Sequence, residues 1–165
     1  MYFTKHGRNL ILVAPQGLGK TMIAKNVAHQ AILHGHSVLS VTAAELLMDL
    51  SSQDSPRGLD RRLRHYAQPA LLVCDELGYL SYDNRNADLL FQVVSRRYEN
   101  KSILLTTNLP FSDWPSIFPN ATCAIALIDR IIHHADIIPI EGDSFRRREA
   151  QGTSDARRQK RPDKP

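Results

Sequence analysis

The sequence has few cysteines and no long hydrophobic run. Its 165 residues include two cysteines, Cys74 and Cys123, which form no C-x-x-C pair, so we expect these thiols to form neither a disulfide nor a zinc site. Every apolar run is shorter than the ~20 residues that cross a bilayer. The N-terminal segment has too short an apolar core for a secretion signal, and no small-residue cleavage site follows. We therefore expect a cytoplasmic protein with no membrane partner.

The charge is unevenly distributed along the chain. The formal net charge is +4, but residues 146–165 hold eight Lys or Arg and three acidic residues, so residues 1–145 carry a net charge of −1. A segment with almost no apolar side chains cannot bury enough surface to order itself. We expect one folded domain over 1–145 and a disordered basic tail over 146–165. Two interpretations of the tail stay open, a solvated end and a non-specific arm for nucleic-acid phosphates.

Short apolar runs alternate with stretches of helical periodicity. The runs over 9–14, 37–43, 70–75, 102–108 and 136–140 predict strands, and the periodicity predicts helices over 21–35, 43–50, 59–67, 86–100 and 124–135. Residues 111–118 indicate a turn or short helix interrupted by Pro115. Strands that are apolar throughout are typical of a parallel sheet covered by helices on both faces. In the first helix we expect the core-facing residues to be Ile23, Val27, Ile32 and Leu33.

A phosphate-binding loop joins the first strand to the first helix. The pattern G-x-x-x-x-G-K-[ST] is matched except that its first glycine is an alanine. An alanine adds one methyl group and fits where φ is negative, so we interpret the loop as intact. We expect the amides to surround phosphates, the lysine to reach the terminal phosphates and the hydroxyl to bind Mg²⁺. The predicted ATP-binding residues are Ala14, Pro15, Gln16, Gly17, Leu18, Gly19, Lys20 and Thr21.

Polar side chains end the third and fourth predicted strands. Asp75 and Glu76 follow the run "LLVC", and Asn108 ends "LLTTN". An ATPase needs one carboxylate near its metal and a second to orient the attacking water. We therefore expect Asp75, with Thr21, to hold Mg²⁺ and Glu76 to act as general base. Asn108 is expected to contact the γ-phosphate or the water, the alternative being a turn before Pro110.

Charged residues of the last two helices have less specific patterns. Arg130 precedes the last strand, where oligomeric ATPases place an arginine facing the neighbouring subunit's nucleotide; an exposed arginine paired with a nearby acid is the alternative. His133 and His134 are adjacent, hence expected on different helix faces, and lack the i, i+4 spacing of a helical metal pair, so we interpret them as structural or surface residues. Arg96 and Arg97 are either a DNA-facing or intersubunit pair or a solvated helix end.

Four segments together resemble one family, the IstB-like transposition helper ATPases of insertion sequences. They are "GRNLILVAPQGLGKTMIAKNVAHQA", "LLVCDELGYLSYD", "ADLLFQVVSRRYENKSILLTTNLPFSDW" and "IALIDRIIHHADIIPIEGDSFRRRE". The resemblance implies an AAA+ αβα sandwich, ATP with Mg²⁺, homo-oligomers on double-stranded DNA and delivery of a transposase. It also implies site roles, with Lys20 and Thr21 as the Walker A pair, Asp75 and Glu76 as the Walker B pair, Asn108 as sensor 1 and Arg130 as the finger acting in trans.

The chain departs from the family pattern at both ends. Members carry a helical domain ahead of the phosphate loop, whereas only a short segment precedes the first strand here, so we expect a fragment or a shortened gene product. The region beyond Glu149 is also longer and more basic than the pattern. Two other functions stay open, a replicative helicase loader of the DnaC type and a nucleotide-binding remnant without activity.

Overall fold

A computed structural model describes residues 7–79 and 81–142, and the predicted basic tail over 146–165 lies outside them. Five strands alternate with helices along the chain. The strands are β1 (Asn9–Val13), β2 (Val38–Thr42), β3 (Leu71–Leu77), β4 (Ser102–Thr107) and β5 (Ala135–Pro139). The helices are α2 (Lys20–Leu33), α3 (Ala43–Ser51), α4 (Pro56–Ala67), α5 (Asn84–Arg97), the 3₁₀ helix η1 (Phe111–Ser116) and α6 (Ala121–Ile132). Within these ranges no helix is long and apolar enough to span a membrane.

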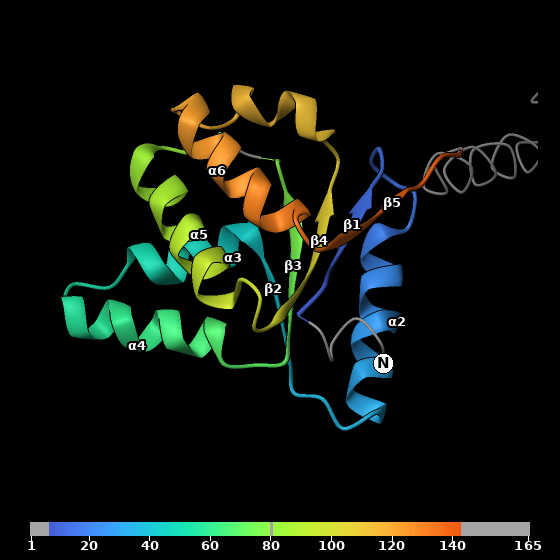
Figure 1. Cartoon of the computed structure of the whole chain (residues 1–165), viewed down its shortest axis with the longest axis horizontal. Helices are drawn as coiled ribbons and strands as arrows, with labels where there is room; N and C mark the ends of the chain where they lie inside the picture. The colour runs from blue at the N-terminus through green and yellow to red at the C-terminus, as the bar shows by residue number, and fades with distance from the viewer. Residues whose placement is uncertain (1–6, 80, 143–165) are drawn as a thin grey trace, which may run out of the picture.

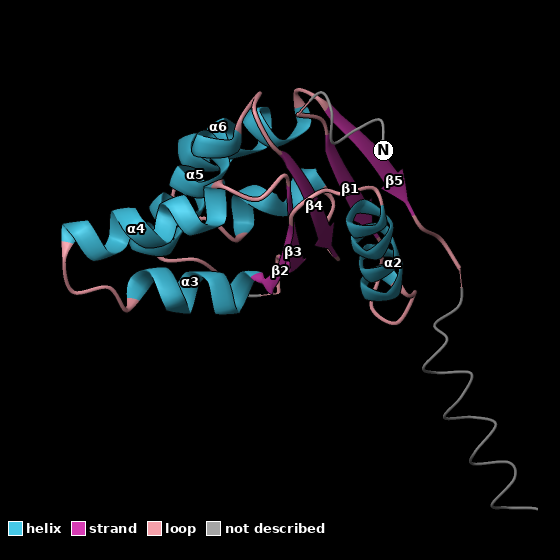
Figure 2. Cartoon of the chain, turned by 90° about the horizontal axis from the view of Figure 1, so that it is seen from below, coloured by secondary structure: helices cyan, strands magenta, loops and turns pink. Residues whose placement is uncertain are grey.

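The strands form one parallel sheet in the order β2-β3-β4-β1-β5 (Figures 1 and 2). The predicted α/β fold with a central parallel sheet is confirmed. Because all strands run in one direction, the loops that follow them gather at the carboxyl ends of the strands and the loops that precede them at the amino ends. The loop after β1 therefore lies beside the carboxyl ends of β3 and β4, where ligands bind in open α/β sheets.

The sheet carries helices on both faces, as predicted for an αβα sandwich. Figure 1 shows α2 on one side and α3, α5 and α6 on the other. Successive residues of β3 point to opposite faces, so Leu71 and Val73 pack under α2 whereas Leu72 and Cys74 pack in the larger core beneath α3, α5 and α6. Both faces of the central strands are thus buried, which explains their unbroken apolar runs.

The predicted core face of α2 is wrong for three of its four residues. Val27 is partly buried and packs against the core, but Ile23, Ile32 and Leu33 are 39%, 57% and 64% exposed, and the helix buries Ala24, Ala28 and Ala31 against the sheet together with Lys20. Small side chains let the helix axis lie close to the strands, and the rotation of the helix is set by the lysine that must face the loop before it. The alanines gave no hydrophobic signal strong enough to compete with the larger residues.

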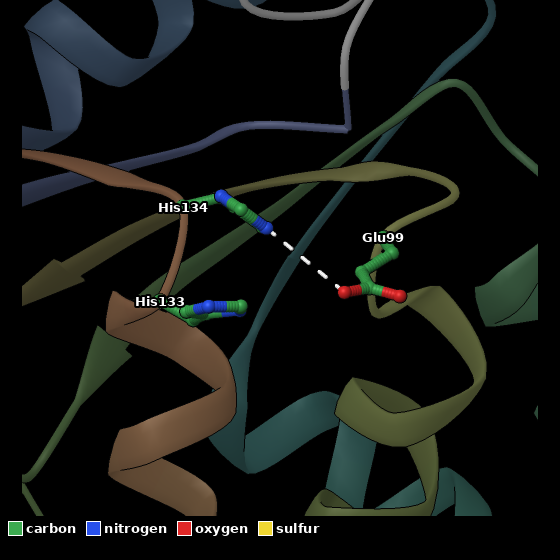
Figure 3. A group of neighbouring side chains, drawn as sticks. All are labelled: Glu99, His133 and His134. Carbon is green, nitrogen blue, oxygen red and sulfur yellow. Dashed lines mark ion pairs between the residues drawn. The ribbon is translucent and has the colours of Figure 1, made fainter.

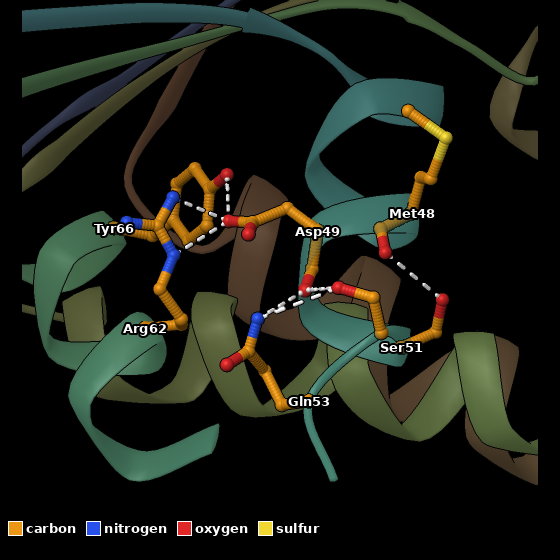
Figure 4. A network of polar contacts seen from close by, with 7 residues as sticks. Met48, Asp49, Ser51, Gln53, Arg62 and Tyr66 are labelled. Atoms are coloured by element: carbon orange, nitrogen blue, oxygen red, sulfur yellow. Dashed lines mark hydrogen bonds and ion pairs between the residues drawn. The ribbon is translucent and has the colours of Figure 1, made fainter. Parts of the chain in front are cut away.

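Polar side-chain contacts fix the start of α3, and others join α3 to α4. The Thr42 hydroxyl accepts from the amide of Glu45 at 3.2 Å, and the Glu45 carboxylate accepts from the amide of Thr42 at 2.9 Å. Further along, Arg62 and the Tyr66 hydroxyl donate to the Asp49 carboxylate at 2.5–2.8 Å (Figure 4). Partial burial by itself would raise the pKa of Asp49, but these bonds lower it. The contact is therefore present at neutral pH and weakens as the pH falls through the lowered pKa.

Several element boundaries differ from the prediction because of end-capping side chains. α4 starts at Pro56, three residues early, since the Ser55 hydroxyl accepts from the amide of Gly58 at 3.1 Å. α6 starts at residue 121, also three residues early, behind Asn120, whose side chain accepts from the amide of Thr122 at 2.8 Å. Each signal was present in the sequence but lay outside the segments that were predicted to be helical.

Arg97 is neither DNA-facing nor solvated. Its side chain is fully buried, and its guanidinium donates to the carbonyls of Tyr66, Ala67, Ala70 and Ser102 at 2.6–3.4 Å. Arg96 points outward and forms a 2.8 Å ion pair with Asp60 of α4. The two adjacent arginines thus have different roles, and Arg97 holds the α4–β3 loop against the start of β4.

Candidate functional site

The loop between β1 and α2 is shaped by two glycines with left-handed backbones. Gly17 has φ 84° and Gly19, the residue before α2, has φ 81°, where an L side chain would be strained. A Cβ added to Gly19 would meet no atom of the described structure within 4 Å, so the space beside it is open. Ala14 is buried and does not have positive φ, and its amide still donates to the Thr107 carbonyl at 3.1 Å. The alanine therefore fits the turn from strand to loop.

Lys20 folds back into this loop. Its side chain is 6% exposed, and Nζ donates to the carbonyls of Ala14 at 2.6 Å and Pro15 at 2.9 Å. A buried ammonium must be compensated by hydrogen bonds or by negative charge. The loop thus holds one positive charge at the N-terminal end of α2, where the helix dipole adds to the attraction for an anion.

The end of β3 presents two carboxylates held by a bulge. The β3–β4 register shifts between Cys74 and Leu77, so that Asp75 and Glu76 together oppose Thr106. The Thr106 hydroxyl donates to Asp75 Oδ1 and accepts from the amide of Glu76 at 2.9 Å. Glu76 has φ 63° and its side chain is exposed, whereas Asp75 is 9% exposed.

Thr106 was missed by the sequence analysis, although it belongs to the "LLTTN" run that predicts a strand. A hydroxyl inside an otherwise apolar, fully buried strand needs a partner. That signal was available, but the partner depends on which strand lies beside β4.

The Cys74 thiol precedes the two carboxylates on β3. Burial, with the Asp75 carboxylate beside it, raises the pKa of the Cys74 thiol to about 12, so this thiol adds no charge to the site at neutral pH.

The loop, α2 and the end of β3 enclose one pocket of about 950 Å³. Of the predicted residues, Gly17, Leu18, Gly19, Lys20, Thr21, Asp75 and Glu76 line it. Ala14, Pro15, Gln16, Asn108 and Arg130 do not. Lining residues that sequence reasoning missed are Met22, Lys25, Asn26, Tyr79, Ile140, Glu141 and Gly142. The last three follow β5, and only the position of that strand beside β1 brings them to the pocket.

Asn108 and Arg130 are predicted catalytic residues that do not line the pocket. Asn108 follows β4, and its side-chain oxygen is buried without a hydrogen-bond partner among the described residues. An unpaired buried acceptor is costly, so this oxygen is suited to receive a donor from a bound molecule. Arg130 lies on α6, across the sheet from α2, with its guanidinium 4.5 Å from the centre of the Phe91 ring. It cannot contact the pocket of its own chain from there.

The residues present fit a nucleotide and a hard divalent cation. The volume is within the range of ligand pockets, the space at Gly19 is open, and Lys20 supplies positive charge. The hydroxyl of Thr21 and the carboxylate of Asp75 are the oxygen donors that Mg²⁺ prefers. Both line the pocket, so they are the residues that would hold the ion.

Comparison with known proteins identifies the family. Residues 1–153 match the model of the family described as IstB-like ATP binding protein. The chain belongs to this family. Among its relatives, a protein named for ATP binding in insertion sequence IS5376 of Geobacillus stearothermophilus is 37% identical over 147 residues, which are 89% of this chain and 59% of that protein. The IstB-like chain therefore spans less than two thirds of that relative.

Solved structures share the P-loop AAA+ fold of this IstB-like chain. The crystal structure of the DnaC helicase loader has a TM-score of 0.68 at 20% identity, with 84% of this chain and 81% of that chain covered. The replication initiator DnaA bound to AMPPCP and single-stranded DNA has a TM-score of 0.69 at 15% identity, with 93% and 46% covered. At these identities the likeness concerns the fold alone. The family match makes the chain a member of an ATP-binding family.

Proposed function

We propose that this chain binds ATP together with Mg²⁺ and hydrolyses it. The observation that carries the proposal is the convergence of Lys20, Thr21, Asp75 and Glu76 on one pocket. These are the groups that phosphoryl transfer to water requires, namely a cation for the terminal phosphates, two metal ligands and a base. The test is the release of phosphate from ATP by the purified full chain, with and without double-stranded DNA.

In this proposal each residue has a distinct role. Lys20 leaves its loop carbonyls and binds the terminal phosphates, while the amides from Gly17 to Gly19 surround them. Thr21 and Asp75 hold the Mg²⁺, which when bound neutralises charge on the phosphate oxygens. Glu76 orients the attacking water and accepts its proton. Its backbone amide donates to the Thr106 hydroxyl, which fixes the backbone from which the carboxylate extends.

Thr106→Val will slow ATP hydrolysis without a comparable loss of ATP affinity. The change removes the hydroxyl that orients both Asp75 and Glu76, and loss of such an outer partner typically lowers activity about tenfold to a hundredfold. Phosphate release and ATP affinity are measured in parallel. Thr107→Val is the matched control, because the Thr107 hydroxyl contacts only the backbone of Leu109. Equal rates in the two variants would contradict the role of Thr106.

We also propose that the chain assists transposition, assembling on double-stranded DNA and recruiting a transposase. Support comes from the insertion-sequence origin of the relative from Geobacillus stearothermophilus. Assembly gives Arg130 a function, since an arginine on the far side of the sheet can reach a nucleotide only in a neighbouring subunit. Normal DNA-stimulated hydrolysis by Arg130→Ala would rule out this role. The alternative function, a replicative helicase loader, is supported only by the likeness of the fold to DnaC. The cytoplasmic location stays a prediction.

The exposed side of α4 is the basic surface that we propose for DNA. Arg57, Arg61, Arg64 and His65 line one open hollow on this helix, at spacings that place them on a single face. Asp60 lies among them, paired with Arg64 at 2.7 Å, and reduces the net charge. Contacts from such arginines to phosphates release counterions and carry no sequence information, so binding through α4 is sensitive to salt and tolerant of sequence.

The double variant Arg57→Ala/Arg61→Ala will bind DNA less tightly and with a flatter salt dependence. Removing two phosphate contacts lowers the magnitude of the slope of log affinity against log salt by about 2 per bound chain. Fluorescence anisotropy with a labelled duplex at several salt concentrations measures it. Arg8→Ala, which removes a partly exposed arginine beside β5, is the control. A slope that is the same in the double variant and the wild type would exclude α4 from the DNA interface.

A further inference from the structure

Three side chains with metal-binding atoms meet at the amino ends of the strands, at the opposite end of the sheet from the proposed ATP pocket. Glu99 lies in the connection from α5 to β4, and His133 and His134 lie in the connection from α6 to β5 (Figure 3). The expectation that the two histidines lie on different faces of a helix is wrong. α6 ends at Ile132, and the rings of His133 and His134 have their centres 4.1 Å apart.

The geometry of this group is close to that of a coordination site. One ligand atom from each residue lies within 4.8 Å of the other two, and His134 Nε2 is 4.0 Å from Glu99 Oε1. Zinc takes imidazole nitrogen and carboxylate oxygen at about 2.0–2.2 Å. The three atoms would have to approach one another to surround one ion, a movement that rotation of these exposed side chains can supply. An exposed contact between histidine and carboxylate at 4.0 Å contributes little to stability by itself.

Neighbouring contacts involve the side chain of His133 and the backbone of Glu99. The Tyr98 hydroxyl is 2.6 Å from His133 Nδ1, and the two rings stack at 5.8 Å. Metal-binding histidines commonly donate their second ring N–H to an oxygen. In the tautomer in which His133 Nδ1–H donates to the Tyr98 oxygen, Nε2 keeps its lone pair for the ion. Glu99 has φ 60°, and Gly7 packs so tightly against it that an added Cβ would lie 2.9 Å from the Glu99 carbonyl oxygen. The Glu99 backbone is thus held in an uncommon conformation.

We propose that Glu99, His133 and His134 bind one divalent transition-metal ion of the zinc class, with water completing the coordination. Two imidazoles and one carboxylate favour zinc or a neighbouring transition metal over Mg²⁺ and Ca²⁺, which prefer oxygen alone. This site is thus chemically distinct from the proposed Mg²⁺ site at the carboxyl ends of the strands. A bound ion ties the α5–β4 connection to the end of α6, the helix that carries Arg130. The proposal stands independently of ATP hydrolysis.

The test is calorimetric titration of the full chain with zinc chloride, in excess Mg²⁺ to occupy the ATP pocket. We expect one Zn²⁺ per wild-type chain, and at least tenfold weaker binding in Glu99→Gln and in His134→Ala. Tyr98→Phe keeps the stacked ring but loses the hydroxyl, and affinity should fall about tenfold, as for other outer partners. His34→Ala, which removes an exposed histidine at the end of α2, is the matched control and should bind like the wild type.

Two further measurements separate coordination from a structural effect. Zn²⁺ should raise the Tm of the wild type and of His34→Ala but not of His134→Ala, because only a chain that binds the ion is stabilised by it. Co²⁺ should give a visible absorption band with the wild type that His134→Ala lacks. The proposal is overturned if the wild type binds no Zn²⁺, or if Glu99→Gln and His134→Ala bind it as tightly as the wild type.

Discussion

Glu76→Gln will bind ATP with an affinity close to that of the wild type and will hydrolyse it at least a hundredfold more slowly. The amide keeps the size of the side chain and its left-handed backbone but cannot accept a proton, and a positioned general base contributes about 10²–10⁴-fold to a rate. Asp75 and Thr21 are unchanged, so the residues proposed to hold Mg²⁺ remain. Single-turnover phosphate release and ATP titration, measured on the same preparation, separate the two effects.

Lys20→Ala provides the contrast for this result. Loss of the ammonium removes a charged hydrogen bond, about 1.5–3 kcal/mol, so ATP affinity falls roughly tenfold to a hundredfold and hydrolysis falls with it. Asp113→Asn changes an exposed carboxylate on η1 and should leave both quantities unchanged. Hydrolysis at the wild-type rate by Glu76→Gln would exclude Glu76 as the base. Wild-type ATP affinity in Lys20→Ala would exclude the loop as the phosphate site.

Arg97→Met will be the most destabilising of the single changes considered for this fold. The Arg97 guanidinium donates to four backbone carbonyls from three segments, and a methionine of similar length replaces none of these bonds. Each buried acceptor left unpaired costs about 1–3 kcal/mol, and partial relaxation of the loop recovers part of it, so we expect a loss of about 3–5 kcal/mol. Urea unfolding followed by circular dichroism measures the loss.

The neighbouring arginine supplies the control. Arg96→Met removes a partly exposed ion pair with Asp60, which is worth about 0–1 kcal/mol. Arg97→Lys keeps the charge but cannot reach four carbonyls with one ammonium, so it should also be clearly destabilised. Burial lowers the pKa of Arg97 to about 10, and below that pH the group is protonated in both folded and unfolded chains. The difference between Arg96→Met and Arg97→Met should therefore not change with pH near neutrality.

Local sequence patterns were sufficient to predict the strands, which are short apolar runs, and the phosphate loop, whose residues follow a strict spacing. The apolar runs identified the five strands of the described sheet, although only the central strands β3 and β4 are buried almost throughout, while β2 and β5 at its sides are partly exposed. The loop from residue 14 to residue 21 was recognised because phosphate binding demands small residues and a lysine in that order. Patterns failed where a residue's neighbour comes from a distant segment. For Arg97 both predicted alternatives, a DNA-facing or intersubunit residue and a solvated helix end, were wrong, since its four carbonyl partners lie at the end of α4, in the α4–β3 loop and at the start of β4.

The amino-acid sequence by itself determined the fold class and the candidate loop, acids and amide, because helix and strand periods and a phosphate loop are local properties of the chain. The tertiary structure alone decided which side chains face each other. Strand order set β4 beside β3 and so joined Thr106 to Asp75 and Glu76. The connections that lead into β4 and β5, at the amino ends of the strands, brought Glu99 to the two histidines. Contacts between distant segments depend on how the sheet is assembled, and no local pattern records that order.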